Sequence, residues 1–509
     1  METLNVALGL IASPGALLAV VVGTFIGLVF GSIPGLTFTV ALALVLPITF
    51  ALDATPAIAL LLSTYIGGMT GGSVSAILLG IPGTPSAAAT VIDGYQMTRR
   101  GQASLALGTA VIVSTFGGLI SLLVMILSIE FVAKMALRFG PAEIFALVLF
   151  GLSTICGLSE KSLLRGLIAG VIGLMIMTIG LDEIEGVQRL TFGTITLQQG
   201  VNLLVAMIAL FAVPHIIQAF VTYYTGKELP VRAADVNAQL PRWQDLKSNF
   251  WLMIRCALMG TGIGAIPGTG GPIAAFLAYA HARKTSKSKI PVGKGALAGV
   301  VAPETANNAV TGGTMIPLLA LGIPGDPATA IVLSGLLIHG LVPGPMLFIE
   351  HPNTISAVYF IIILAYIAVL LLQLLGIRFF VQMLRVPAHL LAVGITVMCC
   401  FGAFAVRNSV FDVYTMGVLG VLAYALMRAR IPLTPIILGL VLGPTLEKEF
   451  RTALILSEGD PVIFVSSVPA VIFLTLAALV FAMPAWRMLR KSKSPEVAKN
   501  AQVQPRNNS

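Results

Sequence analysis

Long apolar runs constrain the fold of this chain more than any other feature. Stretches of about 20 apolar residues or more recur from end to end, for example 103–129, 353–376 and 461–484, and each can cross about 30 Å of hydrocarbon as a helix. Helices are the default spanning element, because lipid offers no partner to a free backbone N–H or C=O. Only 10% of the 509 residues are charged, against about 25% in a soluble chain. The sequence therefore predicts an all-α polytopic membrane protein of roughly 10–12 spans.

The net charge of +9 points to a lipid bilayer rather than to nucleic acid as the partner. The basic residues gather in short hydrophilic loops and in the segment "RMLRKSKSPEVAK", as expected of loops that face an anionic cytoplasmic leaflet. We expect residues 487–509 to form a basic, disordered cytoplasmic tail. The four cysteines lie in apolar segments without ligand spacing and predict neither a disulfide nor a metal site.

An internal repeat divides the chain into two membrane segments, 1–224 and 250–486, joined by a polar cytoplasmic linker at 225–249. The phrase "GIPGTP" at 80–85 returns as "GIPGDP" at 322–327. In the same order, "SIPGLT" in the first half is matched by "AIPGTG" in the second. Several matches in one order indicate duplication.

The loop charges predict that the two repeats are inverted. Arg99 and Arg100 follow the first GIPG segment, whereas the equivalent loop of the second half has no Lys or Arg. The loop around 281–294 is strongly basic, whereas its first-half equivalent "PITFALDATP" has no base. Since basic loops stay cytoplasmic, equivalent loops should lie on opposite sides, as in many secondary transporters. Segments 32–50 and 84–98 are either short spans or re-entrant hairpins.

The Pro-Gly motifs predict helix ends inside the membrane. Each motif ends one helix and begins another, with Thr84 or Asp326 as the N-cap and Pro85 or Pro327 at the first helical position. Free N–H groups at helix N-termini can hold an anion without Lys or Arg, and a carboxylate fits such a site. The alternative is that the breaks are kinks for helix packing and that "TGG" is a small-residue contact surface.

Two groups of candidate site residues follow from these motifs. The candidate substrate-binding residues are Gly35, Thr37, Thr70, Ser73, Gly83, Thr84, Gly268, Thr269, Asn307, Thr311, Thr314 and Gly325. The candidate ion-coupling residues are Glu304, Asn308 and Asp326, with Na⁺ or H⁺ as the ion. Glu304 has no twin in the first half, and it either coordinates Na⁺, carries a proton or lies at the cytoplasmic mouth. No other metal, no cofactor and no catalytic residue is expected.

The remaining polar residues in apolar surroundings carry weaker signals. His215 follows Pro214, and no pair of histidines has metal-ligand spacing, so a solvated or capping role is favoured. Asp182, Glu183 and Glu185 in "LDEIEG" predict a solvated loop. No HExxH or G-x-S-x-G motif is present, which argues against an intramembrane enzyme.

The motifs "GSIPGL", "TGGSVSAILLGIPGTP", "DGY" followed by "RRGQASLALG", and "PETANNAVTGG" resemble the large membrane subunit of the tripartite tricarboxylate transporters over about residues 5–485. The resemblance implies a bacterial inner-membrane secondary transporter of tricarboxylates or dicarboxylates, driven by an ion gradient. It implies two partners, a small four-helix membrane subunit and a periplasmic substrate-binding protein. The motif residues carried over are Gly35, Gly83, Gly268, Gly325, Glu304, Asn307, Asn308, Asp93 and Tyr95. The alternative is a stand-alone carboxylate carrier or channel.

Overall fold

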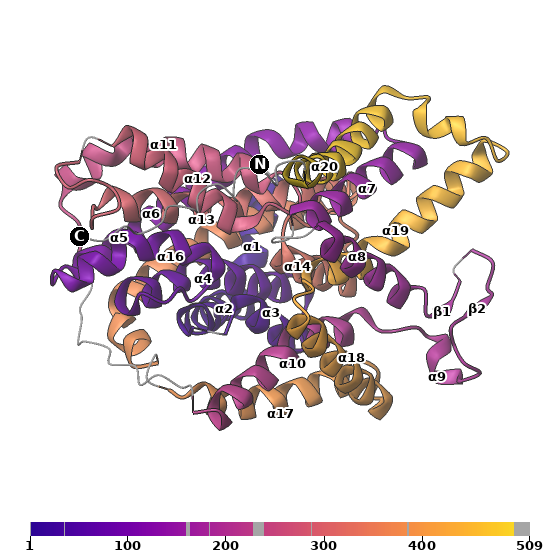
Figure 1. The fold of residues 1–509 in the computed structure, drawn as a ribbon, viewed down its shortest axis with the longest axis horizontal. Coiled ribbons are helices and arrows are strands. Elements are labelled where there is room, and N and C mark those ends of the chain that lie inside the picture. Colours follow the sequence, from indigo (N-terminus) through magenta and orange to yellow (C-terminus); the bar gives the residue numbers. More distant parts are fainter. Residues whose placement is uncertain are drawn as a thin grey trace, which may run out of the picture.

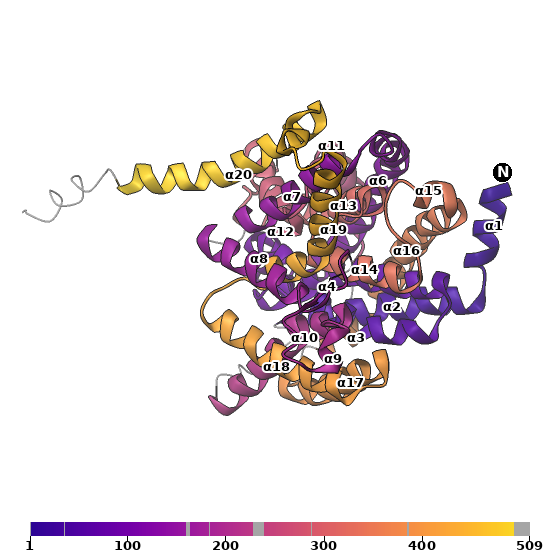
Figure 2. The same ribbon diagram turned by 90° about the vertical axis from the view of Figure 1, so that its right-hand side faces the viewer.

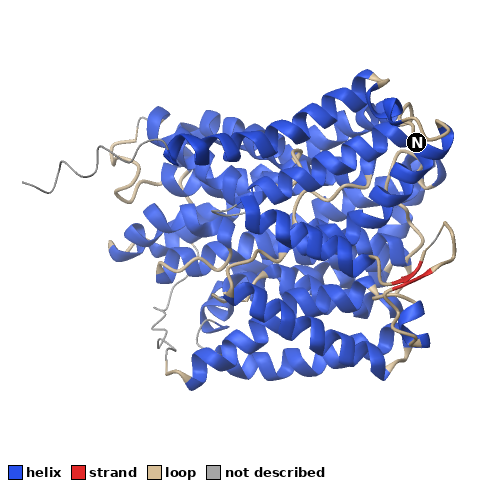
Figure 3. Ribbon diagram, turned by 45° about the vertical axis from the view of Figure 1, so that its right-hand side comes forward, coloured by secondary structure: helices blue, strands red, loops and turns tan. Residues whose placement is uncertain are grey.

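The computed structural model describes residues 2–34, 36–158, 163–182, 184–226, 239–286, 288–383 and 386–492. Helices form nearly all of it (Figure 3), and the one sheet among these residues is the pair β1 (Gly180–Leu181) and β2 (Gln188–Arg189). Seven of the described helices are long and apolar enough to cross a membrane, and five shorter segments are also apolar. The predicted all-α polytopic fold is confirmed.

The helices follow the chain in two series. The first is α1 (Glu2–Ile11), α2 (Pro14–Ser32), α3 (Phe38–Val45), η1 (Leu46–Ala51), α4 (Ala54–Leu79), η2 (Pro85–Ala87), α5 (Ala88–Arg99), α6 (Ala103–Ala136), α7 (Pro141–Leu158), α8 (Leu163–Met177), α9 (Ile195–Gln198) and α10 (Leu203–Tyr224). The second is α11 (Trp243–Gly264), α12 (Gly270–Thr285), α13 (Ala298–Leu321), α14 (Pro327–Ile338), α15 (Leu347–Glu350), α16 (Pro352–Met383), α17 (Ala388–Arg407), α18 (Val410–Arg428), α19 (Thr434–Leu456), η3 (Pro461–Val465) and α20 (Val468–Ser492). Figure 2 shows α20 reaching away from the helical body on the side opposite α1.

Helices α4 and α13 form the centre of the molecule and end in the same way. Residues 57–78 of α4 and 298–320 of α13 are buried throughout. Each helix ends at a glycine in the left-handed conformation, Gly80 with φ 70° and Gly322 with φ 70°, which glycine adopts without steric cost. The predicted helix ends at the two GIPG motifs are confirmed.

The two equivalent helices run in opposite directions where they meet. The Tyr65 hydroxyl of α4 lies 3.3 Å from the Thr314 hydroxyl of α13, and the Thr70 hydroxyl donates to Asn308 Oδ1 at 2.8 Å. Residue numbers therefore rise along α4 as they fall along α13. Opposite directions for equivalent helices are what inverted repeats require.

The repeats exchange helices with each other. The first-half helix α6 packs on α13 and α11, and the second-half helix α16 packs on α4 and α2 (Figure 1). In the same way α8 packs on α19, and α18 packs on α10. The helices of the two membrane segments are therefore interleaved in space. The division of the sequence into two membrane segments, with boundaries at 224 and 250, stays a prediction. Residues 493–509 of the predicted tail lie outside the described residues.

The two basic loops lie together at one end of the molecule. Gln96 Nε2, near the end of α5, donates to the Gly293 carbonyl at 2.9 Å. The Arg100 guanidinium lies beside Gly295 in the loop that follows α12. Their common location agrees with the positive-inside pattern, which places basic loops on one side of a membrane.

Glycines set how closely the central helices approach their neighbours. A Cβ atom on Gly27 of α2 would lie 2.2 Å from the Thr64 carbonyl oxygen of α4, and one on Gly260 of α11 would lie 2.2 Å from the Ala306 carbonyl oxygen of α13. Such close backbone contact between helices needs small residues. Glycine packing therefore accounts for part of the glycine content that the sequence displays.

Gly260 and Gly262 form a matched pair for testing this packing. Gly260→Val should destabilise the protein by about 1–3 kcal/mol, because the added atoms have no room against α13. Gly262→Val should leave the melting temperature near that of the wild type, since a Cβ there meets nothing within 4 Å. Thermal unfolding in detergent, followed by fluorescence-detected gel filtration, measures both; equal melting temperatures would contradict the packing account.

Candidate functional site

A central cavity of about 320 Å³ lies where helices from both repeats begin. It is bounded by the N-terminal ends of α3, η2, α12, α14 and α19, together with one side of α10. Its lining residues are Thr37, Phe38, Thr39, Met69, Pro85, Ser86, Leu210, Phe211, His215, Gly270, Gly271, Pro272, Asp326, Pro327, Leu433 and Thr434. The helices that follow all four Pro-Gly motifs thus start at one shared cavity.

Asp326 is the N-cap that the sequence predicted. Its Oδ1 accepts from the Thr329 backbone N–H at 2.8 Å, and the Asp326 N–H donates back to the Thr329 hydroxyl at 2.9 Å. Its Oδ2 accepts from the Tyr65 hydroxyl at 2.8 Å. The carboxylate is 5% exposed, and both of its oxygens already accept hydrogen bonds. Asp326 therefore fixes the start of α14 and ties it to α4.

The threonines of the other three motifs do not cap their helices through the side chain. The Thr84 hydroxyl pairs with the Ser86 hydroxyl at 3.1 Å, so its predicted capping bond is wrong. The Thr269 hydroxyl donates to the Ile266 carbonyl at 2.9 Å, and the Thr37 hydroxyl lies 2.5 Å from that of Thr39. The first-turn N–H groups of α3, η2 and α12 are thus left without a capping side chain.

The motif glycines are packed inside the protein. A Cβ on Gly83 would lie 2.1 Å from the Gly31 carbonyl oxygen, and one on Gly325 would lie 2.7 Å from Thr314 Cγ2. Neither glycine is among the residues that line the cavity. Gly268 donates its N–H to the Gly325 carbonyl at 2.8 Å. These glycines shape the helix breaks, and Gly35 lies outside the described residues.

The small polar residues at the crossing of α4 and α13 bond mostly to each other. The Ser73 hydroxyl donates to the Thr70 carbonyl at 2.8 Å, and the Thr314 hydroxyl donates to the Thr311 carbonyl at 3.0 Å. The Thr311 and Tyr366 hydroxyls lie 2.6 Å apart. The bonds that join the two helices are those of Tyr65 with Thr314 and of Thr70 with Asn308, and none of Thr70, Ser73, Thr311 or Thr314 is on the cavity lining.

Asn307 differs from these neighbours because one of its polar atoms has no partner. Its Nδ2 donates to the Met69 carbonyl at 3.1 Å, whereas its buried Oδ1 has no hydrogen-bond partner. A Cβ added to Gly271, which lines the cavity, would lie 2.6 Å from that Oδ1. Buried polar atoms are normally satisfied. The free oxygen behind the cavity wall therefore favours a role for Asn307 near a ligand or water.

Glu304 lies in a second buried group that joins α13 to α5 and α6. Its Oε1 accepts from the Thr90 hydroxyl at 2.5 Å, and its Oε2 accepts from the Ser114 hydroxyl at 3.4 Å. Asn308 Nδ2 donates to the same Ser114 oxygen at 2.8 Å. Glu304 is 0% exposed, so the alternative of a carboxylate at a solvated mouth is wrong. A carboxylate buried this deeply, with only hydroxyl partners, needs a cation or a proton to neutralise it.

Asp93 of α5 holds the basic loop after α12 by hydrogen bonds. Its carboxylate accepts hydrogen bonds from the backbone N–H groups of Gly293, Gly295 and Ala296, at 2.6–3.0 Å, and from the Tyr279 hydroxyl at 2.8 Å. All of its bonds cross from the first repeat to the second. These bonds explain why the "DGY" motif has a carboxylate. The tyrosine of the same motif, Tyr95, is 37% exposed.

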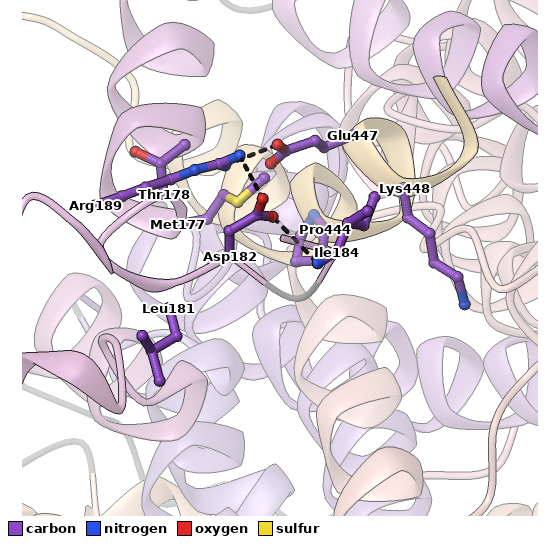
Figure 4. Close-up of a pocket in the computed structure, with 9 residues that line it drawn as sticks. All are labelled: Met177, Thr178, Leu181, Asp182, Ile184, Arg189, Pro444, Glu447 and Lys448. Atoms are coloured by element: carbon purple, nitrogen blue, oxygen red, sulfur yellow. Dashed lines mark hydrogen bonds and ion pairs between the residues drawn. The ribbon is translucent and has the colours of Figure 1, made fainter. Parts of the chain in front are cut away.

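A separate group of ion pairs joins the β-hairpin to α19 (Figure 4). Arg189 lies between Asp182, at 3.2 Å, and Glu447, at 2.7 Å, and Arg451 pairs with Asp182 at 2.9 Å. The Arg451 hydrogen bond lowers the pKa of Asp182. Asp182 is 8% exposed, so its prediction as a solvated loop residue is wrong, whereas the Glu185 side chain is 63% exposed, as predicted, and Glu183 lies outside the described residues. The small adjoining cavity, about 80 Å³, shares no lining residue with the central one.

Sequence reasoning missed what α10 and α19 bring to the central cavity. His215 lines it, and its ring Nδ1 lies 2.8 Å from the Phe211 carbonyl oxygen. Thr434 comes from the start of α19. A proline inside an apolar run breaks the helical hydrogen-bond pattern, so Pro214 was the one local signal that pointed to this position.

Comparison with known proteins shows the family to which the chain belongs. A family model described as the tripartite tricarboxylate transporter TctA family matches residues 17–438. A 52.8 kDa protein of Agrobacterium vitis, named for its place in the TAR-I ttuC' 3' region, is 34% identical over 471 residues, 92% of each chain. A second A. vitis protein, from the TAR-II ttuC' 3' region, is 36% identical over 208 residues, 41% of this chain and 86% of that one. No solved structure matches. The chain therefore belongs to the tripartite tricarboxylate transporter TctA family.

Proposed function

We propose that this multi-pass membrane protein imports an organic carboxylate, a tricarboxylate or dicarboxylate, across the bacterial inner membrane. The observation that carries the proposal is the convergence of helix N-termini from both repeats on one cavity whose described lining residues include no Lys or Arg. Helix N-termini present a partial positive charge and N–H donors, so they hold an anion without a basic side chain. A volume of about 320 Å³ suits a small organic anion.

The substrate-binding residues of this proposal fall into two sets. Thr37 lines the cavity, whereas Thr84 and Thr269 stand one residue before the lining residues Pro85 and Gly270. The free Asn307 Oδ1 behind Gly271 only accepts hydrogen bonds, so it suits a water that accompanies the anion. Gly83, Gly268 and Gly325 shape the breaks, and Thr70 and Thr314 bond across α4 and α13. Ser73 and Thr311 bond beside that crossing, and Gly35 belongs to the set by its motif. Precise placing of helix ends is what an anion site made of backbone groups demands.

Alternating access around this cavity is the mechanism that the repeats favour. In inverted-repeat transporters a fixed midplane site opens to either side as one repeat moves against the other. The antiparallel crossing of α4 and α13 places equivalent elements on opposite sides of such a site. Movement would have to preserve the exchanged packing of α6 and α16, which limits it to rearrangements of whole helix groups.

An ion gradient supplies the energy in this proposal, with Na⁺ or H⁺ as the coupling ion. Glu304 and Asn308 form the candidate coupling site, because they are buried together and share Ser114. Asp326 lines the cavity itself, and its Oδ2 accepts from Tyr65 of α4, the helix whose Thr70 bonds to Asn308. Neutralising Glu304 by a cation or a proton would change the hydrogen bonds that join α13 to α5 and α6.

The partners of the proposal are a small four-helix membrane subunit and a periplasmic binding protein that delivers the anion. The family belongs to a tripartite system, which supports partners in general. The alternative is a stand-alone carrier or channel.

Reconstitution distinguishes these possibilities. Proteoliposomes that contain the chain and the small subunit, with the binding protein outside, should accumulate a radiolabelled di- or tricarboxylate when a Na⁺ or H⁺ gradient is imposed. Omitting the binding protein should reduce uptake to that of empty vesicles. Undiminished uptake without it would favour the stand-alone carrier, and gradient-independent equilibration would favour a channel.

A further inference from the structure

We propose that His215 contacts the bound carboxylate through a protonated imidazole, so that the anion and one proton occupy the central cavity together. The inference rests on the proposed function of the cavity as a carboxylate site. It assigns a specificity role to a residue that none of the Pro-Gly motifs contains.

The local structure of α10 determines which ring nitrogen carries hydrogen. Pro214 has no N–H and cannot continue the helical hydrogen-bond pattern. The next residue turns its ring back along the helix, and His215 Nδ1 lies 2.8 Å from the Phe211 carbonyl oxygen. A carbonyl oxygen only accepts hydrogen bonds, so Nδ1 must be the protonated nitrogen.

The state of the other nitrogen then decides whether an anion can bind. In the neutral ring Nε2 holds a lone pair, and a carboxylate oxygen, which is also an acceptor, would be repelled by it. Only the imidazolium form presents an Nε2–H donor and a positive charge. Because His215 lines the cavity, contact with a carboxylate there requires the second proton.

Few other titratable groups face this part of α10. Among the cavity-lining residues only His215 and Asp326 titrate, and the Asp326 oxygens accept from Thr329 and Tyr65. Helix α3 brings no titratable residue, and the first charged residue of α19 is Glu447, more than three turns from its start.

The helices α17 and α18 also pack on α10. Arg407 and Asp412 pair with each other, and Arg407 reaches Gln199, which precedes α10. The His389 ring packs at a tilt against Tyr223, near the end of α10, with ring centroids 4.0 Å apart. Beyond these, α17 carries Cys399 and Cys400, and α18 carries Tyr414, Tyr424 and Arg428.

The helix N-termini around the cavity couple proton binding at His215 to binding of the anion. The N-termini of α3, α12 and α19 meet at the cavity without a capping side chain, and their partial positive charges oppose an imidazolium while the cavity is empty. A bound carboxylate reverses that field and favours protonation. By linkage, an anion that raises proton affinity must itself bind more tightly when the proton is present.

Calorimetry on the purified chain tests the inference, with citrate and succinate as probes. In wild type, binding should weaken by up to about tenfold per pH unit once the imidazole loses its proton. Titrations in two buffers of different ionisation enthalpy should show uptake of about one proton per anion. His215→Gln should bind with little pH dependence and without that proton uptake.

Two further variants make the outcome decisive. His215→Asn keeps N–H donors for the Phe211 carbonyl and should behave like His215→Gln, so a folding defect in one variant does not remove the test. His351→Gln, at a histidine exposed outside the cavity, should keep the wild-type proton uptake. If the His215 variants bind with unchanged proton uptake, the role of His215 is overturned alone. If the wild type binds neither probe, the carboxylate function falls, and the role of His215 with it.

Discussion

Replacing Gly83 with alanine should abolish uptake, whereas the equivalent change at Gly325 should leave a substantial part of it. A Cβ on Gly83 would lie 2.1 Å from the Gly31 carbonyl oxygen and 2.7 Å from the Ser75 hydroxyl. The nearest atom to a Cβ on Gly325 is a methyl group of Thr314 at 2.7 Å. A backbone carbonyl held between α2 and α4 cannot yield as a side-chain methyl can. Gly83→Ala must therefore displace the helix break itself.

Initial rates of carboxylate uptake in proteoliposomes measure this difference, with the amount of inserted protein checked by gel filtration. Gly262→Ala, where a Cβ meets nothing within 4 Å, serves as the matched control and should transport like the wild type. The sequence repeat alone predicts equal losses at Gly83 and Gly325. Equal losses would therefore show that the asymmetry of packing has no functional effect.

The helix breaks could be predicted from the sequence because their chemistry is local. Gly80 and Gly322 adopt the left-handed conformation that ends each helix, and the proline two residues later cannot continue the helix. Asp326 could be named as a cap for the same reason, since its partner Thr329 is three residues away. Thr84 has the same spacing to its helix, but its hydroxyl finds Ser86 instead, and that choice depends on a 3₁₀ turn that propensity does not reveal.

The partners of the buried residues could not be predicted, because they come from distant parts of the chain. Glu304 could be named as a candidate ion-coupling residue, but its donors Thr90 and Ser114 lie 214 and 190 residues away. The exchange of α6 and α16 between the repeats brings such residues together, and no periodicity in the sequence encodes it. For the same reason α10 supplies His215 to a cavity whose other lining residues come mostly from the helix starts that follow the Pro-Gly motifs.

Glu304→Gln should lower the initial uptake rate by about 10- to 100-fold while leaving the protein folded, because coupling between two binding sites is typically worth about 1–3 kcal/mol and each 1.4 kcal/mol is tenfold. The amide keeps an oxygen for the Thr90 hydroxyl and offers an N–H to Ser114, so the buried group stays satisfied. What it loses is the ability to take up a cation or a proton. Uptake rates under a Na⁺ gradient and under a pH gradient measure the loss.

The gradient that the variant no longer uses identifies the ion. If Glu304 carries a proton, Glu304→Gln loses the response to pH and keeps any response to Na⁺; if Glu304 coordinates Na⁺, the reverse holds. Glu130→Gln, at a 71% exposed carboxylate paired with Lys134, controls for removing a charge from the chain and should transport normally. Wild-type uptake by Glu304→Gln under both gradients would remove Glu304 from the coupling site and leave its burial as a feature of packing alone, and the contacts of Glu304 with α5 and α6 would then serve only to join the two repeats.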